Sequence, residues 1–166
     1  MTKNTSYFIS TTIAIVFSLI GVANVYSQEY KALAGLESIN AVVDFRKDDP
    51  TEVATYLTLI HGTYKGVKMT INENADFVVV FTGSVVKLLC TNKEGFPSEE
   101  HETIDNIANL VAAMVKDGIR MEGCLYATKS FGIEPESILP GIEGIGNGWL
   151  SLIGYQAKNY SLLTIY

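Results

Sequence analysis

Apolar and polar positions follow two alternating patterns along the chain from residue 39 onward. Residues 39–45 (INAVVDF) and 75–83 (ADFVVVFTG) are short runs of mostly apolar side chains, many of them β-branched. Such runs are typical of strands that are covered on both faces. In the longer segments, apolar residues recur every three or four positions, which predicts helices with one buried face. The chain is therefore predicted to alternate strands with helices.

The first predicted helix begins at a well-marked capping sequence. Asp49 is expected at the N-cap, Pro50 at the first helical position and Glu52 three residues after the cap. This is a capping box with a proline at a position where its missing N–H costs nothing. Helical spacing then predicts one buried face, formed by Val53, Leu57, Ile60 and Tyr64.

A second long helix is predicted after the loop at residues 91–98. Its apolar stripe consists of Ile104, Ile107, Val111 and Met114, and Gly118 is the expected stop. The shorter predicted elements are, in chain order, a helix at 84–90 capped by Ser84, a weak strand at 119–124, a helix at 125–132 closed by Gly132, a brief strand at 136–146, a final helix at 147–160 and a terminal strand at 161–166.

This alternation predicts an α/β sandwich. Strands that alternate with helices form a mainly parallel sheet with helices on both faces. In such sheets, ligands gather outside the carboxyl ends of the strands. Two candidate positions lie at such ends: Cys124, and the turn at residues 82–84.

The first 27 residues have the features of a secretory signal peptide. Lys3 is the only charged residue before Glu29, an apolar run spans about residues 13–23, and Ser27 offers a cleavage site. The alternative is a retained membrane anchor, because residues 7–26 approach the roughly 20 residues that span a bilayer. We expect cleavage and a periplasmic or secreted protein, with a membrane partner only if this segment is retained.

Composition predicts one acidic domain after this segment. Residues 28–37 form a lead-in and residues 38–166 the domain, because no repeat, low-complexity tract or linker follows residue 38. The chain has a formal net charge of −6 and no stripe of Lys and Arg, so no nucleic-acid partner is expected. No metal or cofactor site is predicted: the histidines lack ligand spacing, and Gly-rich residues 141–149 lack the Lys-Ser/Thr of a phosphate loop.

Cys124, one of two cysteines in the chain, is the candidate catalytic residue. A sulfur at a helix N-terminus is stabilised as the thiolate by unpaired N–H groups. Arg120, Lys129 or a basic group from a second subunit could add positive potential. For a nucleophile, we expect an open sulfur at the rim of the sheet. The alternatives at this position are a small buried core residue or half of a disulfide.

A disulfide between Cys90 and Cys124 is disfavoured by the predicted geometry. Cys90 lies about six residues into a predicted helix that starts at the sheet edge, so it descends roughly 9 Å from that edge. Disulfides require Cα atoms within about 7 Å of each other. Cys90 is therefore predicted to be a core residue.

Five stretches, in this order and spacing, resemble the DsrE/DsrF-like family: INAVVDF…DP, VVVFTGSVVKLL, DGIRMEGCLYATKSFGI, ILPGI and GWLSLIGYQAKNY. The resemblance covers roughly residues 38–166 and points more narrowly to the exported branch of small single-domain members. It implies a flavodoxin-like three-layer α/β sandwich with a mainly parallel sheet of about five strands and no flavin. It also implies a homo-oligomer, either a trimer or a hexamer.

In sulfur-relay members of this family, a cysteine at the end of a strand carries sulfur as a persulfide, and Cys124 is the matching position. The resemblance therefore implies sulfurtransferase-like activity, with a sulfur donor or acceptor protein as partner. The alternative is a non-catalytic oligomeric binding or assembly module with a structural Cys124 and a contact through side chains such as Trp149. A flavin or nucleotide site ranks last, because residues 46–50 (RKDDP) stand where a phosphate loop would follow the first strand.

Overall fold

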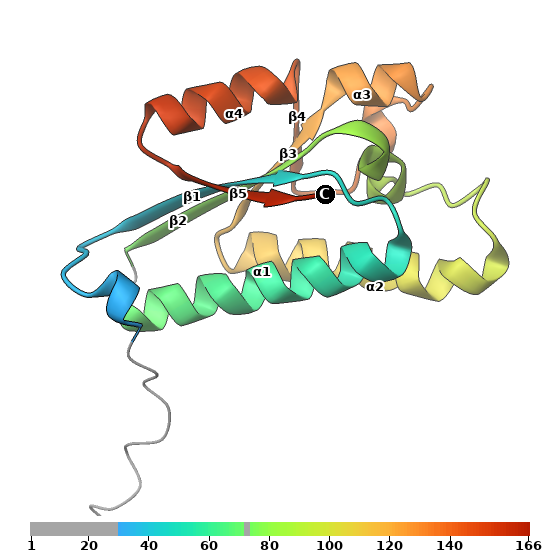
Figure 1. The fold of residues 1–166 in the computed structure, drawn as a ribbon. Helices are drawn as coiled ribbons and strands as arrows, with labels where there is room; N and C mark the ends of the chain where they lie inside the picture. Colours follow the sequence, from blue (N-terminus) through green and yellow to red (C-terminus); the bar gives the residue numbers. More distant parts are fainter. Residues whose placement is uncertain (1–29, 72–73) are drawn as a thin grey trace, which may run out of the picture. The chain divides into compact units, whose positions relative to one another are not determined.

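A parallel sheet of five strands forms the centre of the fold (Figure 1). The computed structural model describes residues 30–71 and 74–166, and Leu33–Tyr166 is one compact unit. The predicted α/β fold with a mainly parallel, five-stranded sheet is confirmed. The strands are β1 (Ile39–Phe45), β2 (Ala75–Phe81), β3 (Arg120–Cys124), β4 (Ile142–Ile145) and β5 (Ser161–Ile165), in the order β4-β3-β2-β1-β5 with every neighbouring pair parallel.

The predicted signal peptide or anchor at residues 1–27 lies outside the described residues. Within the predicted lead-in segment, the structure describes a short 3-10 helix, η2 (Lys31–Leu33). Among the residues that the structure describes, no helix combines the length and the apolar character needed to cross a bilayer.

Helices cover both faces of the sheet, which gives a three-layer sandwich consistent with a flavodoxin-like fold. α1 (Pro50–Thr70) and α2 (His101–Lys116) lie along one face, and α3 (Leu125–Ser130) and α4 (Gly148–Ala157) lie on the opposite side (Figure 1). The connections contain three more 3-10 helices: η3 (Gly83–Leu89), η4 (Ser98–Glu100) and η5 (Pro135–Ser137).

The path of the chain across the sheet explains why α4 lies opposite α1 and α2. From β1 to β4 each strand is added on the same side of the preceding one, and β5 then returns to the free edge of β1. Because connections between parallel strands are right-handed, this reversal of direction moves the connecting helix to the other face. α4 therefore packs over the face that α1 and α2 leave open.

The two faces of the sheet are buried in different ways. On the α1 and α2 side, strand residues such as Val43 and Val79 join a large apolar core with the predicted stripes of both helices. On the α4 side the apolar cluster is small and consists of Val42, Val78, Val80 and Leu152. Polar side chains of β3 and α4 occupy much of this second interface.

One predicted cap is wrong. The short helix expected at 84–90 is present as the 3-10 helix η3, but Thr82 takes the N-cap position that was expected for Ser84. The Ser84 hydroxyl instead donates a hydrogen bond to Asp48, at 2.5 Å, in the loop after β1. The chain after β2 is therefore tied to the neighbouring strand end.

The Asp49 cap of α1 is confirmed and provides a test of the fold. Its carboxylate accepts the backbone N–H of Glu52 at 2.9 Å. Asp49→Ala removes this acceptor, so the free energy of unfolding should fall by about 1 kcal/mol, whereas Asp49→Ser should keep most of it. Urea denaturation measures both variants. Equal stability of Asp49→Ala and the wild type would show that the cap contributes nothing.

Candidate functional site

Cys124 lies at the predicted place, the carboxyl edge of the sheet. It is the last residue of β3 and the N-cap residue of α3. The register of β2 and β3 places Phe81 opposite Gly123. The residues that follow them, Thr82 after β2 and Cys124 at the end of β3, therefore lie side by side. The two strand ends that the sequence singled out are thus neighbours.

The Cys124 sulfur accepts a hydrogen bond from the start of α4. The backbone N–H of Gly148, the first residue of α4, donates to Cys124 Sγ at 3.3 Å. The first N–H groups of a helix have no partner within it and form the positive end of its dipole. Cys124 is also the N-cap residue of α3, but its side chain makes no cap hydrogen bond there, so the donor at the sulfur comes from α4. Such surroundings stabilise a sulfur that carries negative charge.

The close approach of α4 to the strands requires glycine at position 148. A Cβ atom there would lie 2.5 Å from Thr82 Cγ2 and 3.3 Å from Cys124 Cβ. The first distance is far shorter than a normal carbon–carbon contact. Any side chain at this position would therefore push the start of α4 away from the sulfur or displace Thr82.

Apolar side chains shield the Cys124 sulfur from solvent. Cys124 is 6% exposed and forms a buried cluster with Val86 of η3 and Ala127 of α3, against which Ile133 packs. The expectation of an open sulfur is therefore wrong, because η3 and the chain after α3 fold over the strand end. Access to the thiol requires a small reagent or movement of these side chains.

Cys90 and Cys124 are both free thiols. Cys90 follows η3 and is buried, as predicted, and its S–H donates to the Val86 carbonyl oxygen at 3.2 Å. Burial raises the pKa of the Cys90 thiol, and a hydrogen bond with Ser137 opposes this effect. At neutral pH, Cys90 is therefore held as the protonated, less nucleophilic thiol.

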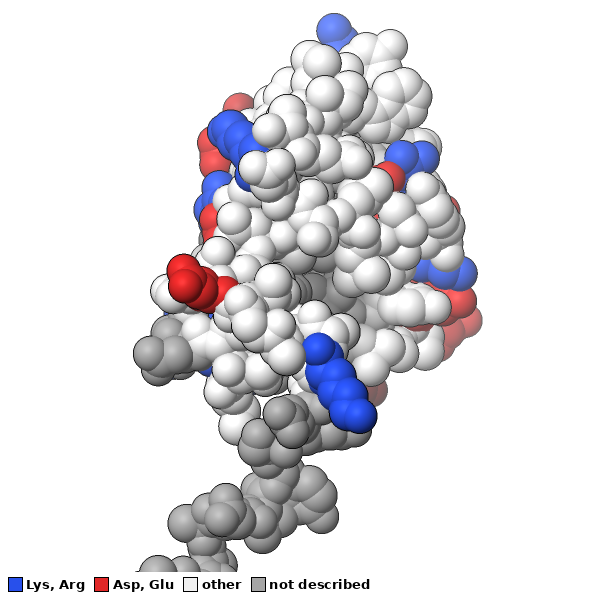
Figure 2. All heavy atoms as spheres, turned by 60° about the vertical axis from the view of Figure 1, so that its left-hand side comes forward, with Lys and Arg blue, Asp and Glu red and all other residues white. Residues whose placement is uncertain are grey.

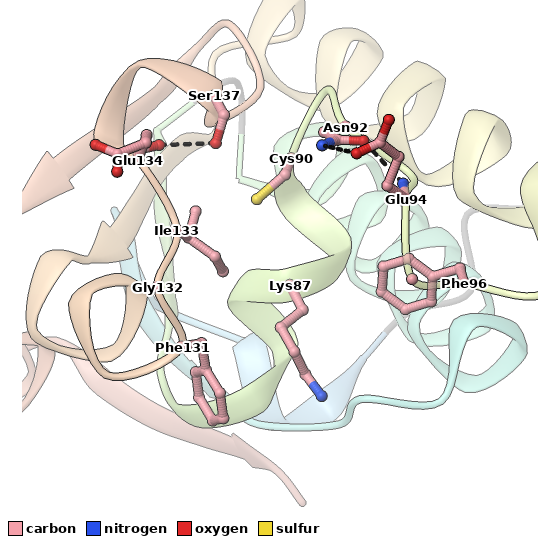
Figure 3. A pocket seen from close by; sticks show the side chains of 11 residues that line it. Lys87, Cys90, Asn92, Glu94, Phe96, Phe131, Gly132, Ile133, Glu134 and Ser137 are labelled. Atoms are coloured by element: carbon pink, nitrogen blue, oxygen red, sulfur yellow. Dashed lines mark hydrogen bonds between the residues drawn. The ribbon is translucent and has the colours of Figure 1, made fainter.

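A pocket of about 420 Å³ opens beside Cys90 (Figure 3). Its walls come from η3, the loop at residues 92–96 and the segment 131–137 after α3. Figure 3 shows the Cys90 sulfur pointing toward Ile133. Ile133 lines this pocket and also packs against the cluster that holds Cys124. Ile133 thus contacts both the pocket and the buried cluster.

A family model described as the DsrE/DsrF-like family matches residues 48–165. The match includes Cys124 and all strands except β1. The chain belongs to the DsrE/DsrF-like family. Among curated proteins, none matches the chain.

Two solved structures are similar to this DsrE/DsrF-like chain in fold. The protein of unknown function MTH1491 from Methanobacterium thermoautotrophicum has a TM-score of 0.61 and 15% identity, covering 76% of this chain and 99% of its own. The ychN protein from E. coli has a TM-score of 0.56 and 15% identity, with the same coverage of 76% and 99%. At this identity the similarity shows a shared fold.

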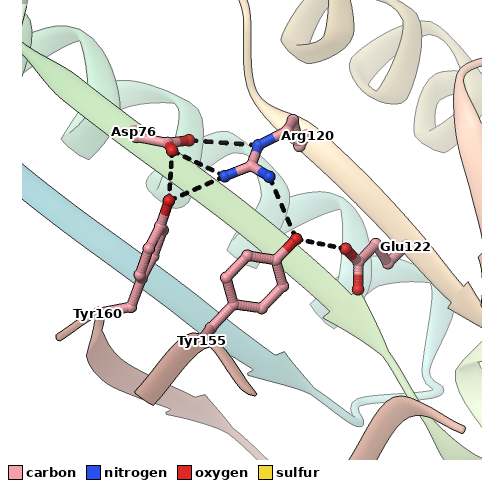
Figure 4. A network of polar contacts seen from close by, with 5 residues as sticks. All are labelled: Asp76, Arg120, Glu122, Tyr155 and Tyr160. Atoms are coloured by element: carbon pink, nitrogen blue, oxygen red, sulfur yellow. Dashed lines mark hydrogen bonds and ion pairs between the residues drawn. The ribbon is translucent and has the colours of Figure 1, made fainter. Parts of the chain in front are cut away.

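Next to Cys124 in this DsrE/DsrF-like fold, a buried carboxylate is bound by α4 (Figure 4). Glu122 is 7% exposed and accepts hydrogen bonds from the Ser151 hydroxyl and from the Tyr155 hydroxyl, the latter at 2.5 Å. Residues two apart on a strand face the same side. Glu122 and Cys124 therefore both face α4.

Arg120, at the opposite end of β3, is joined to this carboxylate through the Tyr155 hydroxyl (Figure 4). It pairs with Asp76 at 2.7 Å and donates to the hydroxyl groups of Tyr155 at 3.2 Å and Tyr160 at 3.0 Å. The Tyr160 hydroxyl also donates to Asp76. Arg120 therefore does not supply positive potential at Cys124, and Lys129, the other candidate, lies exposed in the last turn of α3.

The protonation of Tyr155 keeps this network intact at neutral pH. Burial, together with the hydrogen bond to Glu122, raises the pKa of Tyr155 to about 12. Its hydroxyl therefore remains a hydrogen-bond donor throughout the pH range in which a cysteine thiol titrates, near ~8.5 in model compounds.

Cys124 was predicted from the sequence, but the groups that surround it were not. Gly148 was expected only to begin a helix, and Glu122 only to lie within a weak strand. A charged residue between apolar strand neighbours was one available signal. The other was the spacing of Ser151 and Tyr155, which places two hydroxyl groups on one face of the final helix.

Two glycines of α4 provide matched substitutions. At position 154 a Cβ atom would meet nothing within 4 Å, so Gly154→Ala should stabilise the protein by about 0.5–1 kcal/mol through helix propensity. At position 148 the overlap with Thr82 should make Gly148→Ala destabilising by roughly 1–3 kcal/mol. Urea denaturation of the two variants compares them directly. If both variants were stabilised alike, α4 would not approach Cys124 as closely as described.

Proposed function

We propose that this DsrE/DsrF-like protein binds and relays sulfur as a persulfide on Cys124. The supporting observation is the Gly148 N–H, which is directed at Cys124 Sγ at 3.3 Å. A cysteine that only fills space needs no donor at its sulfur, whereas a thiolate or persulfide anion is stabilised by one. The family resemblance supports the same assignment, because Cys124 matches the cysteine that carries sulfur in relay members.

The proposed exchange balances without an external oxidant. The Cys124 thiolate attacks the outer sulfur of a donor persulfide, R–S–SH, and the donor S–S bond breaks. R–S⁻ leaves, takes a proton from water, and Cys124–S–SH remains on the protein. An acceptor thiolate then attacks the outer sulfur, takes it as R′–S–SH, and releases Cys124 as the thiolate.

The burial of Cys124 favours a small donor. Because Cys124 is only 6% exposed, a hydrogen polysulfide or a small organic persulfide, which needs only a narrow opening, reaches its sulfur more easily than a donor protein. The pocket beside Cys90 offers such a molecule a place next to the Cys124 cluster, because Ile133 contributes to both. Rotation of the Ile133 side chain would then open a path to the sulfur. Delivery by a donor protein requires a larger movement of η3 or α3.

We further propose a homo-oligomer, a trimer or hexamer, that acts in the periplasm or outside the cell. The location follows from the character of residues 1–27. The assembly is supported by α4, whose Trp149, Leu150 and Ile153 are 63%, 67% and 62% exposed. Large apolar side chains that gather on one exposed helix often mark a protein contact, and a second subunit would cover them.

Intact-mass analysis after polysulfide treatment tests the sulfur assignment. The wild type and Cys90→Ser should each gain the mass of sulfur, and a thiol reductant should remove it, because Cys124 is present in both. Cys124→Ser should gain none. Equal labelling of Cys124→Ser and the wild type would reject Cys124 as the sulfur carrier. Loss of labelling in Cys90→Ser alone would identify Cys90, beside the pocket, as the carrier.

A non-catalytic assembly module is the second candidate, and the burial of Cys124 favours it. The face turned forward in Figure 2 is mostly uncharged at its centre, and most of its Lys, Arg, Asp and Glu side chains lie toward the left and right edges. Such a surface suits a protein contact. Two results together would select this candidate: the wild type takes up no sulfur from polysulfide, and Cys124→Ala forms the same assembly as the wild type.

A further inference from the structure

We propose that Glu122 is a positioning residue for Cys124: it holds α4 against β3 and so keeps the Gly148 N–H on the sulfur. The inference rests on the proposed function, because it concerns how the same thiol is kept ready for sulfur exchange. Glu122 acts through α4, to which both of its hydroxyl donors belong.

The two contacts of Glu122 fix both the position of α4 along its axis and its rotation about that axis. Ser151 donates to one oxygen of the carboxylate and Tyr155 to the other, and residues four apart lie on the same face of a helix. Within one subunit, apolar packing alone holds α4 weakly, since only Gly148 and Leu152 of its ten residues are buried. The carboxylate therefore provides much of the attachment of α4 to β3.

The attachment point lies close enough to the sulfur to control it. Ser151 comes three residues after Gly148, which is about 4.5 Å along the helix axis. The N–H to Sγ distance is already 3.3 Å, and hydrogen bonds weaken steeply as their geometry worsens. Loss of the Glu122 contacts would therefore allow the first turn of α4 to move off Cys124.

Burial makes Glu122 and α4 depend on each other. A carboxylate that is 7% exposed is costly unless hydrogen bonds satisfy its oxygens. The Ser151 and Tyr155 hydroxyls are the donors that satisfy it, and they reach it only while α4 lies against the sheet. An apolar residue at position 122 would remove this cost but would also remove the attachment.

The far end of α4 supplies a matched control. Tyr160 follows the helix, and its ring packs on that of Tyr155 with centroids 4.9 Å apart. Its hydroxyl binds Asp76 and Arg120 instead of Glu122. Tyr160→Phe therefore removes the same atom as Tyr155→Phe, from the same aromatic pair, without touching the Glu122 attachment.

The test is the pH dependence of Cys124 alkylation by iodoacetamide in the full chain carrying Cys90→Ser. Tyr155→Phe should raise the pH midpoint of alkylation by at least about half a unit, a roughly threefold loss of thiolate below the midpoint. Ser151→Ala combined with Tyr155→Phe should raise it further. Tyr160→Phe should change it by less than about 0.2 unit. Circular dichroism checks that each variant is folded. If the double variant does not fold, the alkylation midpoint of Tyr155→Phe alone decides the test.

Glu122→Gln separates positioning from simple charge. Removing a negative charge close to the sulfur would by itself lower the midpoint, whereas loss of an acceptor for α4 raises it, and we expect the rise. The other charged groups on elements around Cys124 are kept in every variant: Lys87, Lys129, Glu143, Asp44 with Arg46, and Arg120. Arg120 loses one hydroxyl partner in Tyr155→Phe and one in Tyr160→Phe, so the comparison of these two variants cancels that loss.

Two results would overturn the positioning role. One is an equal shift in Tyr155→Phe and Tyr160→Phe, which would indicate a general effect on stability. The other is a lowered midpoint in Glu122→Gln with no shift in Tyr155→Phe, which would leave only charge. Failure of the proposed function looks different: the wild type takes up no sulfur from polysulfide, while its alkylation midpoint still depends on Tyr155.

Discussion

The Gly148 N–H and the Cys124 sulfur form the contact on which the rest of the site depends. It joins the start of α4 to the end of β3 at 3.3 Å, and it exists because the chain reverses direction after β4 and brings α4 over the free face of the sheet. Glycine at position 148 permits the approach, and Glu122 holds the helix that makes it. The fold topology and the buried Glu122 carboxylate thus place one backbone N–H against the Cys124 sulfur.

The fold was predictable from the sequence because its signals are local. The alternation of apolar runs with helical stripes predicted a mainly parallel sheet, and Asp49 with Pro50 marked the start of α1. The position of Cys124 at a strand end followed from the same pattern. These features depend on period, capping and turn chemistry, each of which can be recognised within a few residues.

The surroundings of Cys124 were not predictable, because they depend on contacts between distant segments. Gly148 is 24 residues from the sulfur it binds, and Glu122 is 29 residues from Ser151. The burial of the sulfur was missed for the same reason: Val86 and Ile133 cover it from two separate connections. Local pattern placed the thiol at the sheet edge, but only tertiary packing determined that this edge is closed.

The measurement that tests the central contact most directly is a pH titration of backbone amide resonances by NMR. The Gly148 amide should shift as Cys124 loses its proton and should lose this shift in Cys124→Ser, because its N–H donates to the sulfur. The Gly154 amide, in the same helix, should not follow the same titration. A Gly148 amide that stays constant while the Cys124 thiol titrates would contradict the contact, and with it the proposed stabilisation of a sulfur anion.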